Sequence, residues 1–350
     1  EFFGVVTNLV GGWLGARLGL NRTMNMGLGL QVFALLLLTV PSSMLTVIWV
    51  MIAQALSGIA KDLNKMSAKS SIKLLVPSDA NGQQTLYQWV AKLTGSKNAL
   101  KGVGFFLGSI LLSTLGFTLA IAAMAAALAI VWLFSIFALK QDLGKAKNKP
   151  KFTDIFSTSR AVNYLAAARL FLFAARDVWF VVALPVFLST TFGWSFYQVG
   201  GFLALWVMGY GMVQTLAPSI TGLKKGRIPD GQSAFHWAIL LAVLPASIAV
   251  ALFYSVATMP VVVGGLLLFG VVFAVNSSIH SFLIVNYAKA DGVSMDVGFY
   301  YMANAMGRLL GTVLSGWLFQ VAGLGACLWV SSGFVLLAAG LSLALPRHKM

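Results

Sequence analysis

The sequence predicts an all-α membrane protein built from two six-helix bundles, with the first helix missing from this chain and about 11 transmembrane helices present. Only 9% of the 350 residues are charged, whereas a typical soluble domain carries about 25%. About eleven apolar runs approach the ~20 residues that a helix needs to cross a bilayer. Such runs must be helical in lipid, because their backbone groups need internal hydrogen-bond partners.

The expected spans form two groups on either side of a polar, basic stretch. They cover residues 1–15, 24–41, 45–66, 95–115 and 118–139, and then 161–188, 198–220, 234–255, 259–287, 297–319 and 322–345. We therefore expect an N-terminal helical bundle at 1–139, a cytoplasmic linker loop at 140–160 and a C-terminal helical bundle at 161–350.

Positive charge is distributed unevenly between the loops. With the C-terminus inside, lysine and arginine are absent from the outside loops, which lie near Pro41, Gly116, Gly193, Ala257 and Gly323. This asymmetry indicates membrane orientation, so the net charge of +15 predicts topology and no nucleic-acid partner. We expect the chain to lie in a lipid bilayer, with its central loop and its C-terminus in the cytoplasm.

The first inside loop carries a pattern of glycines and arginines. Gly12, Arg17, Gly19 and Arg22 resemble the signature between helices 2 and 3 of the major facilitator superfamily. The resemblance implies the major facilitator fold, with these four residues at a cytoplasmic gate. Ala16 stands where the superfamily usually has aspartate, so the usual charge relay lacks its acid. Basic residues that only set topology are the alternative.

Four lysines recur at every fourth position along the third expected span and just beyond it. Lys61, Lys65, Lys69 and Lys73 therefore form one slowly turning stripe on a helix. Lys61 and Lys65 are candidate substrate-binding residues in a cavity, or they extend to the membrane surface. We expect Lys69 and Lys73 on a solvated face.

A second pair of lysines opens the next helix. Lys97 and Lys101 share a face that continues into Gly104 and Gly108. Because small residues let helices pack closely, these lysines are candidates for facing protein and binding substrate. Extension to the membrane surface is the alternative.

The sharpest functional signal lies in the span 161–188. Arg169 and Arg176 are seven residues apart and nearly aligned on one helix face. A buried arginine costs at least ~2.5 kcal/mol, so it should face a wet cavity, a partner or a bound anion. Arginine suits oxyanions because its fork binds two oxygens at once. Asp177 is either a structural partner of Arg176 or Arg308, or a proton-coupling carboxylate.

The span 297–319 contains the third deep arginine. Asn304 and Arg308 are four residues apart, and both are candidate substrate-binding residues. Gly307, Gly311 and Ser315 form a small-residue stripe that we expect to serve helix packing.

The span 259–287 has a polar side, formed by Asn276, Ser277, Ser278, His280 and Asn286. His280 is either a proton relay or an interior histidine whose nitrogens are bonded within the protein.

Several classes of function lack their motifs. The sequence has no nucleotide-binding Gly-Lys-Ser/Thr loop, no metal-ligand spacing and no nucleophile motif with a base. We therefore expect no enzyme, no cofactor and no metal. Cys327, the single cysteine, cannot supply a multi-thiolate site.

Four long runs resemble one branch of the superfamily, the organoarsenical efflux permease of bacterial arsenic-resistance operons. They are ALSGIAKDLNKMSAKSSIKLLVP at 55–77, LTGSKNALKGVGFFLG at 93–108, DLGKAKNKPKFTDIFS at 142–157 and AARLFLFAARDVWFVVALPVFL at 167–188. The resemblance covers essentially the whole chain.

This resemblance implies a secondary active transporter of the bacterial inner membrane that exports 1-arseno-3-phosphoglycerate and confers arsenate resistance. A glyceraldehyde-3-phosphate dehydrogenase makes that ester, so a functional link to this enzyme is implied. We expect a monomer that works by alternating access and is coupled to protons. The residues alone indicate an anion transporter, so transport of another organophosphate, a sugar or a drug, and an anion channel, are the alternatives.

Overall fold

The computed structural model describes residues 2–77, 81–139, 143–147, 150–157, 159–256 and 258–347, and every regular element in these ranges is a helix. The α-helices are α1 (Phe2–Leu18), α2 (Leu20–Leu36), α3 (Val47–Leu75), α4 (Gly82–Ala138), α5 (Arg160–Phe180), α6 (Ala183–Phe192), α7 (Phe196–Ile220), α8 (Gly231–Phe253), α9 (Thr258–Tyr287) and α10 (Val293–Ser342). Short 3-10 helices lie at Leu37–Thr39, Ser42–Met44, Phe152–Ile155 and Leu223–Lys225. The predicted all-α class is confirmed.

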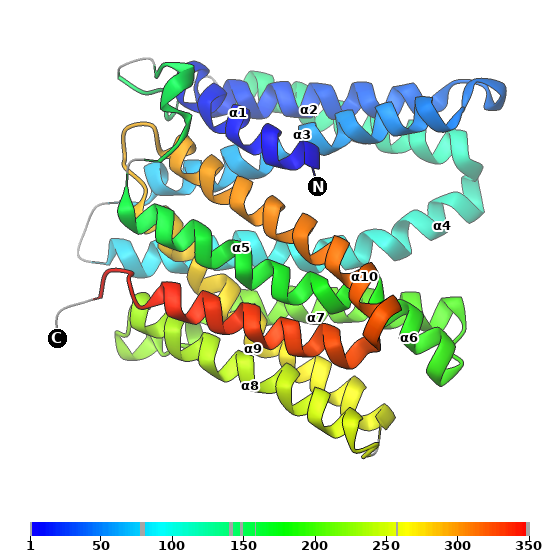
Figure 1. The fold of residues 1–350 in the computed structure, drawn as a ribbon. Coiled ribbons are helices and arrows are strands. Elements are labelled where there is room, and N and C mark those ends of the chain that lie inside the picture. The colour runs from blue at the N-terminus through cyan, green and yellow to red at the C-terminus, as the bar shows by residue number, and fades with distance from the viewer. Residues whose placement is uncertain are drawn as a thin grey trace. The chain divides into compact units, whose positions relative to one another are not determined.

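Two of these helices are too long for a single membrane crossing. The 57 residues of α4 would extend roughly 85 Å as one straight helix, whereas a bilayer core is about 30 Å thick. Gly116 interrupts α4 at φ 73° and Gly323 interrupts α10 at φ 74°, a conformation that glycine adopts without a steric penalty. At both glycines the chain turns back on itself (Figure 1).

Within the described residues, seven helical stretches are long and apolar enough to cross a membrane. The structure thus does not show the eleven expected spans as separate helices. Three of the seven stretches each combine two helical segments. They are the two arms of α4, the two arms of α10, and α5 together with α6. The 17-residue α1 is too short to qualify, and α3 carries four lysines.

Packing divides the chain into two compact units. The first unit comprises Glu1–Pro77, Gly104–Ser157 and Ala288–Met302, and the second comprises Ser78–Val103, Thr158–Tyr287 and Ala303–Met350. The bundle boundaries expected at 139 and 161 stay a prediction. Positions 140–142, 148, 149 and 158 of the expected linker lie outside the described residues.

In the first unit, α3 packs against both α1 and α2. The beginning of α10 crosses α1 closely, because Gly12 and Gly298 lie at the contact. A Cβ atom on Gly12 would lie only 2.7 Å from the carbonyl oxygen of Ser294 and 3.2 Å from Cα of Gly298. The Ser294 hydroxyl also donates to the carbonyl oxygen of Gly12 at 2.8 Å. Glycine at both positions therefore allows this backbone approach.

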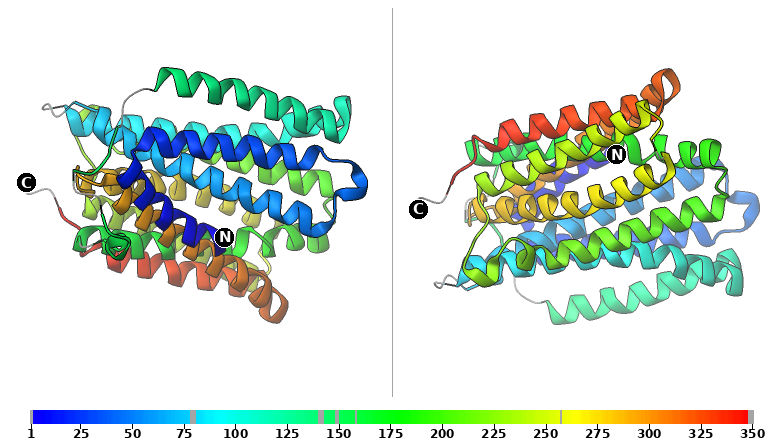
Figure 2. Two further views of the ribbon diagram at one scale, coloured as in Figure 1. Left: turned by 90° about the horizontal axis from the view of Figure 1, so that it is seen from above. Right: turned by 90° about the horizontal axis from the view of Figure 1, so that it is seen from below.

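In the second unit, α9 packs against α5, α7 and α8 (Figure 2). Aromatic rings fill the centre, with Trp179, Phe269 and Phe273 fully buried. The break between α5 and α6 is stabilised by Ser315 of α10, whose Oγ accepts hydrogen bonds from the backbone N–H groups of Val182 and Ala183 at 3.3 and 3.1 Å. These contacts hold the chain directly after the end of α5, one to two turns beyond Arg176.

Candidate functional site

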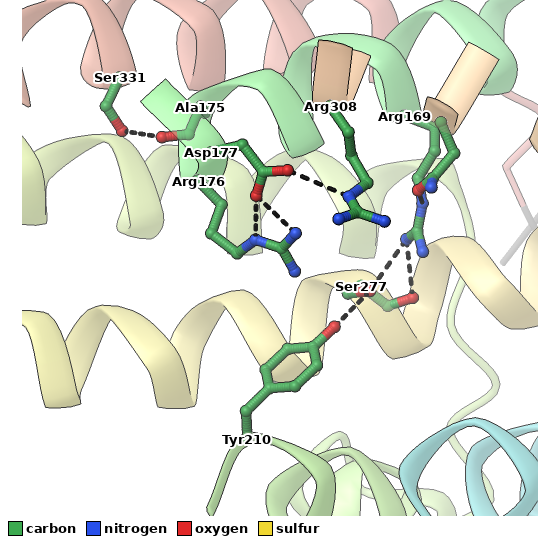
Figure 3. Close-up of polar contacts among 9 residues, drawn as sticks. Arg169, Ala175, Arg176, Asp177, Tyr210, Ser277, Arg308 and Ser331 are labelled. Carbon is green, nitrogen blue, oxygen red and sulfur yellow. Dashed lines mark hydrogen bonds and ion pairs between the residues drawn. The ribbon is translucent and has the colours of Figure 1, made fainter. Parts of the chain in front are cut away.

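Two of the deep arginines share one carboxylate in the second unit (Figure 3). Arg176 donates from Nε to Oδ1 of Asp177 at 2.6 Å, and its NH2 group lies 2.5 Å from the same oxygen. Arg308 donates from Nε to the other oxygen, Oδ2, at 3.1 Å. The Asp177 side chain is fully buried, whereas that of Arg308 is 30% exposed. One buried acid thus orients two guanidinium groups from different helices.

The third deep arginine, Arg169, is 4% exposed and is bonded to neutral groups. Its Nε donates to Oδ1 of Asn304 at 2.9 Å, and its NH1 donates to Oγ and to the carbonyl oxygen of Ser277 at 2.9 and 3.2 Å. Asp177 is the only acidic residue of the sequence between positions 154 and 230. Counted over Arg169, Arg176, Arg308 and Asp177 alone, three positive charges and one negative charge leave a formal surplus of two positive charges.

The ring of Phe173 lies next to two of the arginines. The guanidinium carbon of Arg169 lies 3.9 Å from the ring centroid and that of Arg176 lies 4.8 Å from it, within the range of cation–π attraction. Phe173 is four residues after Arg169 and three before Arg176, so all three residues share one face of α5. The seven-residue spacing therefore brings both guanidinium groups to the same ring.

A buried polar network holds Ser277, and most of its members were not predicted. Ser277 Oγ lies 3.1 Å from the hydroxyl of Tyr210 and 3.2 Å from Nε2 of Gln214, and Asn98 donates to Oε1 of Gln214 at 2.5 Å. Because its groups bond one another, the network makes the surroundings of Arg169 rigid. The sequence did contain one signal for this network. Gln214 lies four residues after Tyr210 inside an apolar helix, where an amide without a hydrogen-bond partner is costly.

Small residues bring α5 and α10 together at the site. A Cβ atom on Gly307 would lie 2.1 Å from the carbonyl oxygen of Leu170, and one on Gly311 would lie 2.8 Å from that of Ala174. The predicted packing role of these two glycines is confirmed. Their close contact places Arg308 of α10 beside Asp177 of α5.

The predicted lysines are divided between the two units. Lys97 and Lys101 are exposed on α4 in the second unit, and Lys61 is exposed on α3 in the first unit. Lys65 is partly buried, lies 3.2 Å from Asp62 and stacks over the ring of Tyr301 at 3.9 Å. Substrate binding by these four lysines stays a prediction.

The expected solvated face of Lys69 and Lys73 is wrong. Lys69 is only 2% exposed, with Nζ 5.1 Å from the ring centroid of Tyr301. Lys73 is partly buried and donates to the carbonyl oxygen of Ala288. The physical reason is that segment 288–302 contacts this side of α3, so Lys69 meets the ring of Tyr301 and Lys73 meets the carbonyl oxygen of Ala288.

The lysine–tyrosine contact can be tested by removing the ring. Tyr301→Leu is expected to lower the stability of the first unit by about 1 kcal/mol or more, because cation–π pairs contribute roughly 0.5–2 kcal/mol. Tyr301→Phe keeps the ring and should lose less. Thermal unfolding of the two purified variants measures the difference, and equal stability would show that the ring contributes nothing.

The four predicted gate residues lie between the second half of α1 and the beginning of α2. Gly12 permits the contact with α10, and Gly19 joins α1 to α2 with φ 98°. Arg17 is exposed in the last turn of α1, 5.0 Å from the ring of Trp13, and Arg22 is exposed on α2. A basic residue at the end of a helix interacts favourably with its dipole. Gating by these residues stays a prediction.

Comparison with known structures establishes the class of the fold. The human organic anion transporter TETRAN superposes with a TM-score of 0.77 and 19% identity, over 97% of this chain and 82% of that one. The E. coli fucose:proton symporter gives 0.72 and 11%, over 98% and 88%. A bacterial homologue of the iron transporter ferroportin gives 0.72 and 18%, over 98% and 87%.

The chain therefore shares the fold of these transporters. Its fold is that of the major facilitator superfamily. No family model and no curated protein sequence matches it. Since the three identities lie between 11 and 19%, this likeness shows the fold alone and does not identify a substrate.

Proposed function

We propose that the chain is a secondary transporter of small organic anions and that Arg169, Arg176 and Arg308 bind the anion. The observation that carries this proposal is a set of three guanidinium groups inside apolar helices, two of which share one carboxylate while the third is bonded to Asn304. Charge inside a membrane protein is costly and is retained where it serves a substrate or a partner. An oxyanion would offset the positive surplus and could be bound by the planar fork of arginine.

The arrangement suits an anion with two charged ends. Arg176 and Arg308 are fixed by Asp177, whereas Arg169 is held separately by Ser277 and Asn304. The Phe173 ring contacts Arg169 and Arg176. A substrate with an oxyanion at each end of a short organic chain would match these two positions.

The resemblance to the organoarsenical efflux permeases supplies such a substrate. 1-Arseno-3-phosphoglycerate carries an arsenate group and a phosphate group, and its export would confer resistance to arsenate. We infer eleven membrane crossings, because α4 and α10 each turn back at a glycine. On this proposal the transporter lies in the bacterial inner membrane, with its central loop and C-terminus in the cytoplasm.

Asp177 was predicted to be either a structural partner of an arginine or a proton-coupling carboxylate, and its contacts favour the structural role. Both of its oxygens accept hydrogen bonds from guanidinium groups, and these come from two different helices. A carboxylate held in this way orients Arg176 and Arg308 for the anion. Proton coupling by Asp177 stays a prediction that awaits transport measurements at different proton gradients.

The anion site is tested by removing one guanidinium group at a time. Arg169→Gln, Arg176→Gln and Arg308→Gln should each reduce export at least about tenfold, since hydrogen bonds to charged groups contribute roughly 1.5–3 kcal/mol. Export is measured as arsenate resistance of an arsenic-sensitive bacterium that also expresses the dehydrogenase. Arg160→Gln is the matched control, because Arg160 is exposed at the beginning of the same helix.

The result would contradict the proposal if all three variants reached the membrane and exported as well as the unchanged protein. Resistance that does not depend on the dehydrogenase would instead argue against the arsenate ester. Uptake of labelled organophosphates into inverted vesicles would then identify the anion.

A further inference from the structure

A pair of buried polar side chains on α9 has no hydrogen-bond partner within the described part of the chain. Asn276 and His280 are both 0% exposed. Neither the amide nitrogen nor the amide oxygen of Asn276 is bonded, and neither ring nitrogen of His280 is bonded. The two residues are four positions apart, so their side chains lie on the same face of the helix. His280 is thus not the interior histidine with bonded nitrogens that the sequence allowed.

These groups lie beside the candidate anion site. Ser277, which follows Asn276 directly, accepts hydrogen bonds from Arg169. The guanidinium group of Arg169 is also close enough to interact electrostatically with the His280 ring. The unbonded pair therefore adjoins the arginine that is held by neutral groups rather than by Asp177.

Buried polar groups in native proteins are nearly always hydrogen-bonded, because leaving them unbonded forfeits their hydration without compensation. Four unbonded atoms on one face therefore point to a ligand that bonds them. A neutral imidazole presents one donor and one acceptor, and an amide presents donors and an acceptor. A hydroxyl group, which both donates and accepts, matches this pair, whereas an oxyanion offers only acceptors.

A metal ion fits the pair poorly. Within the described residues, no group of three or more histidine, cysteine, aspartate or glutamate side chains could hold one. The adjacent positive charge of Arg169 would also repel a cation. The chemistry therefore favours an uncharged polar group attached to an anion.

We propose that Asn276 and His280 form a subsite that binds a hydroxyl group of the transported anion while Arg169 binds a charged group of the same molecule. The inference rests on the proposed function and narrows it, because it specifies a hydroxylated organic anion. The subsite becomes accessible to the substrate during the transport cycle.

The first test compares two ligands that differ by one hydroxyl group. The probes are 3-phosphoglycerate and 3-phosphonooxypropanoate, and binding is measured by thermal stabilisation of the purified full chain. The unchanged protein should prefer the hydroxylated ligand by about three- to tenfold, the contribution of one neutral hydrogen bond. Asn276→Leu and His280→Leu should abolish this preference.

The same two variants give a second readout without ligand. Replacing unbonded buried polar groups with apolar ones should leave the Tm of the free protein unchanged or raise it by about 2–4 °C. Asn163→Leu, at an exposed position on α5, is the control and should keep the ligand preference. A retained preference in the α9 variants, or a clearly lowered Tm, would overturn the subsite.

A labelling experiment separates failure of the subsite from failure of the proposed function. In a Cys327→Ala background, His280→Cys should react with a small polar thiol reagent at least about tenfold faster than Ala274→Cys, because only a subsite that opens to water admits the reagent. Ala274 is equally buried but lies in the apolar core of the same helix. Equal, slow reaction would exclude the subsite whatever the arginine variants do.

The labelling experiment could succeed while the binding experiment fails, and this combination has a different meaning. Fast reaction at position 280, combined with no binding of either phosphate compound by the unchanged protein, would contradict transport of such anions. It would leave the pair as an accessible polar site that serves a different substrate.

Discussion

Asp177→Asn is expected to destabilise the second unit by roughly 3–5 kcal/mol, the cost of removing one partner from a buried ion pair. The substitution keeps the shape of the side chain but removes the negative charge between Arg176 and Arg308. Two guanidinium groups would then repel each other across a fully buried position. Thermal unfolding in detergent, together with the yield of monodisperse protein, measures the loss.

The double variant Asp177→Asn/Arg308→Gln provides the matching control. It removes one of the two repelling charges and should recover part of the lost stability, although it should not recover export. An asparagine variant as stable as the unchanged protein would show that the carboxylate does not hold the arginines together.

Gly307→Ala is expected to have the second large effect, because the added methyl group has no room. Its Cβ atom would lie 2.1 Å from the carbonyl oxygen and 2.8 Å from the carbonyl carbon of Leu170, which are backbone atoms that cannot rotate away. Helices α5 and α10 must move apart, at a cost of about 1–3 kcal/mol or more. Because Arg308 follows directly, its distance to Asp177 should also increase and export should fall.

Gly316→Ala is the control for helix propensity. Nothing lies within 4 Å of the Cβ position at Gly316, which belongs to the same helix. This change should be neutral or stabilising by up to about 1 kcal/mol, since alanine favours the helix. If both variants unfolded at the same temperature, the close contact between α5 and α10 would carry no energetic weight.

A feature was predictable from the sequence when its energetic cost depends only on the residue and on the apolar run that contains it. An arginine inside an apolar run is expensive wherever the run packs, so Arg169, Arg176 and Arg308 could be recognised without a structure. The helical class followed in the same way from the length and composition of the runs. The seven-residue spacing on α5 was also enough to place two arginines on one face.

The partners of these residues depend on distant segments and were not predictable in the same way. Asp177 had several possible roles, and only the structure shows that its two oxygens contact two different arginines. Tyr210 and Gln214 lie on α7 and meet Ser277 of α9. Single-sequence periodicity gives the face of a helix but not the helix that covers it.

The buried lysines illustrate the same limit. The four-residue repeat correctly indicated a stripe on α3, but Lys69 is covered by Tyr301 of α10, more than 200 positions later. The two glycine turns, in contrast, were expected from the sequence as loops near Gly116 and Gly323, and α4 and α10 are interrupted at these residues.

The aromatic neighbours of the arginine site give the protein a spectroscopic probe of its own. Trp206 stacks parallel to Tyr210, with the planes at 5° and the centroids 5.7 Å apart, and its indole N–H is fixed to the carbonyl oxygen of Leu266. Tyr210 in turn bonds Ser277. A solute that draws Arg169 away from Ser277 would shift the tyrosine ring under the indole, so occupancy can be followed by intrinsic fluorescence without an attached dye.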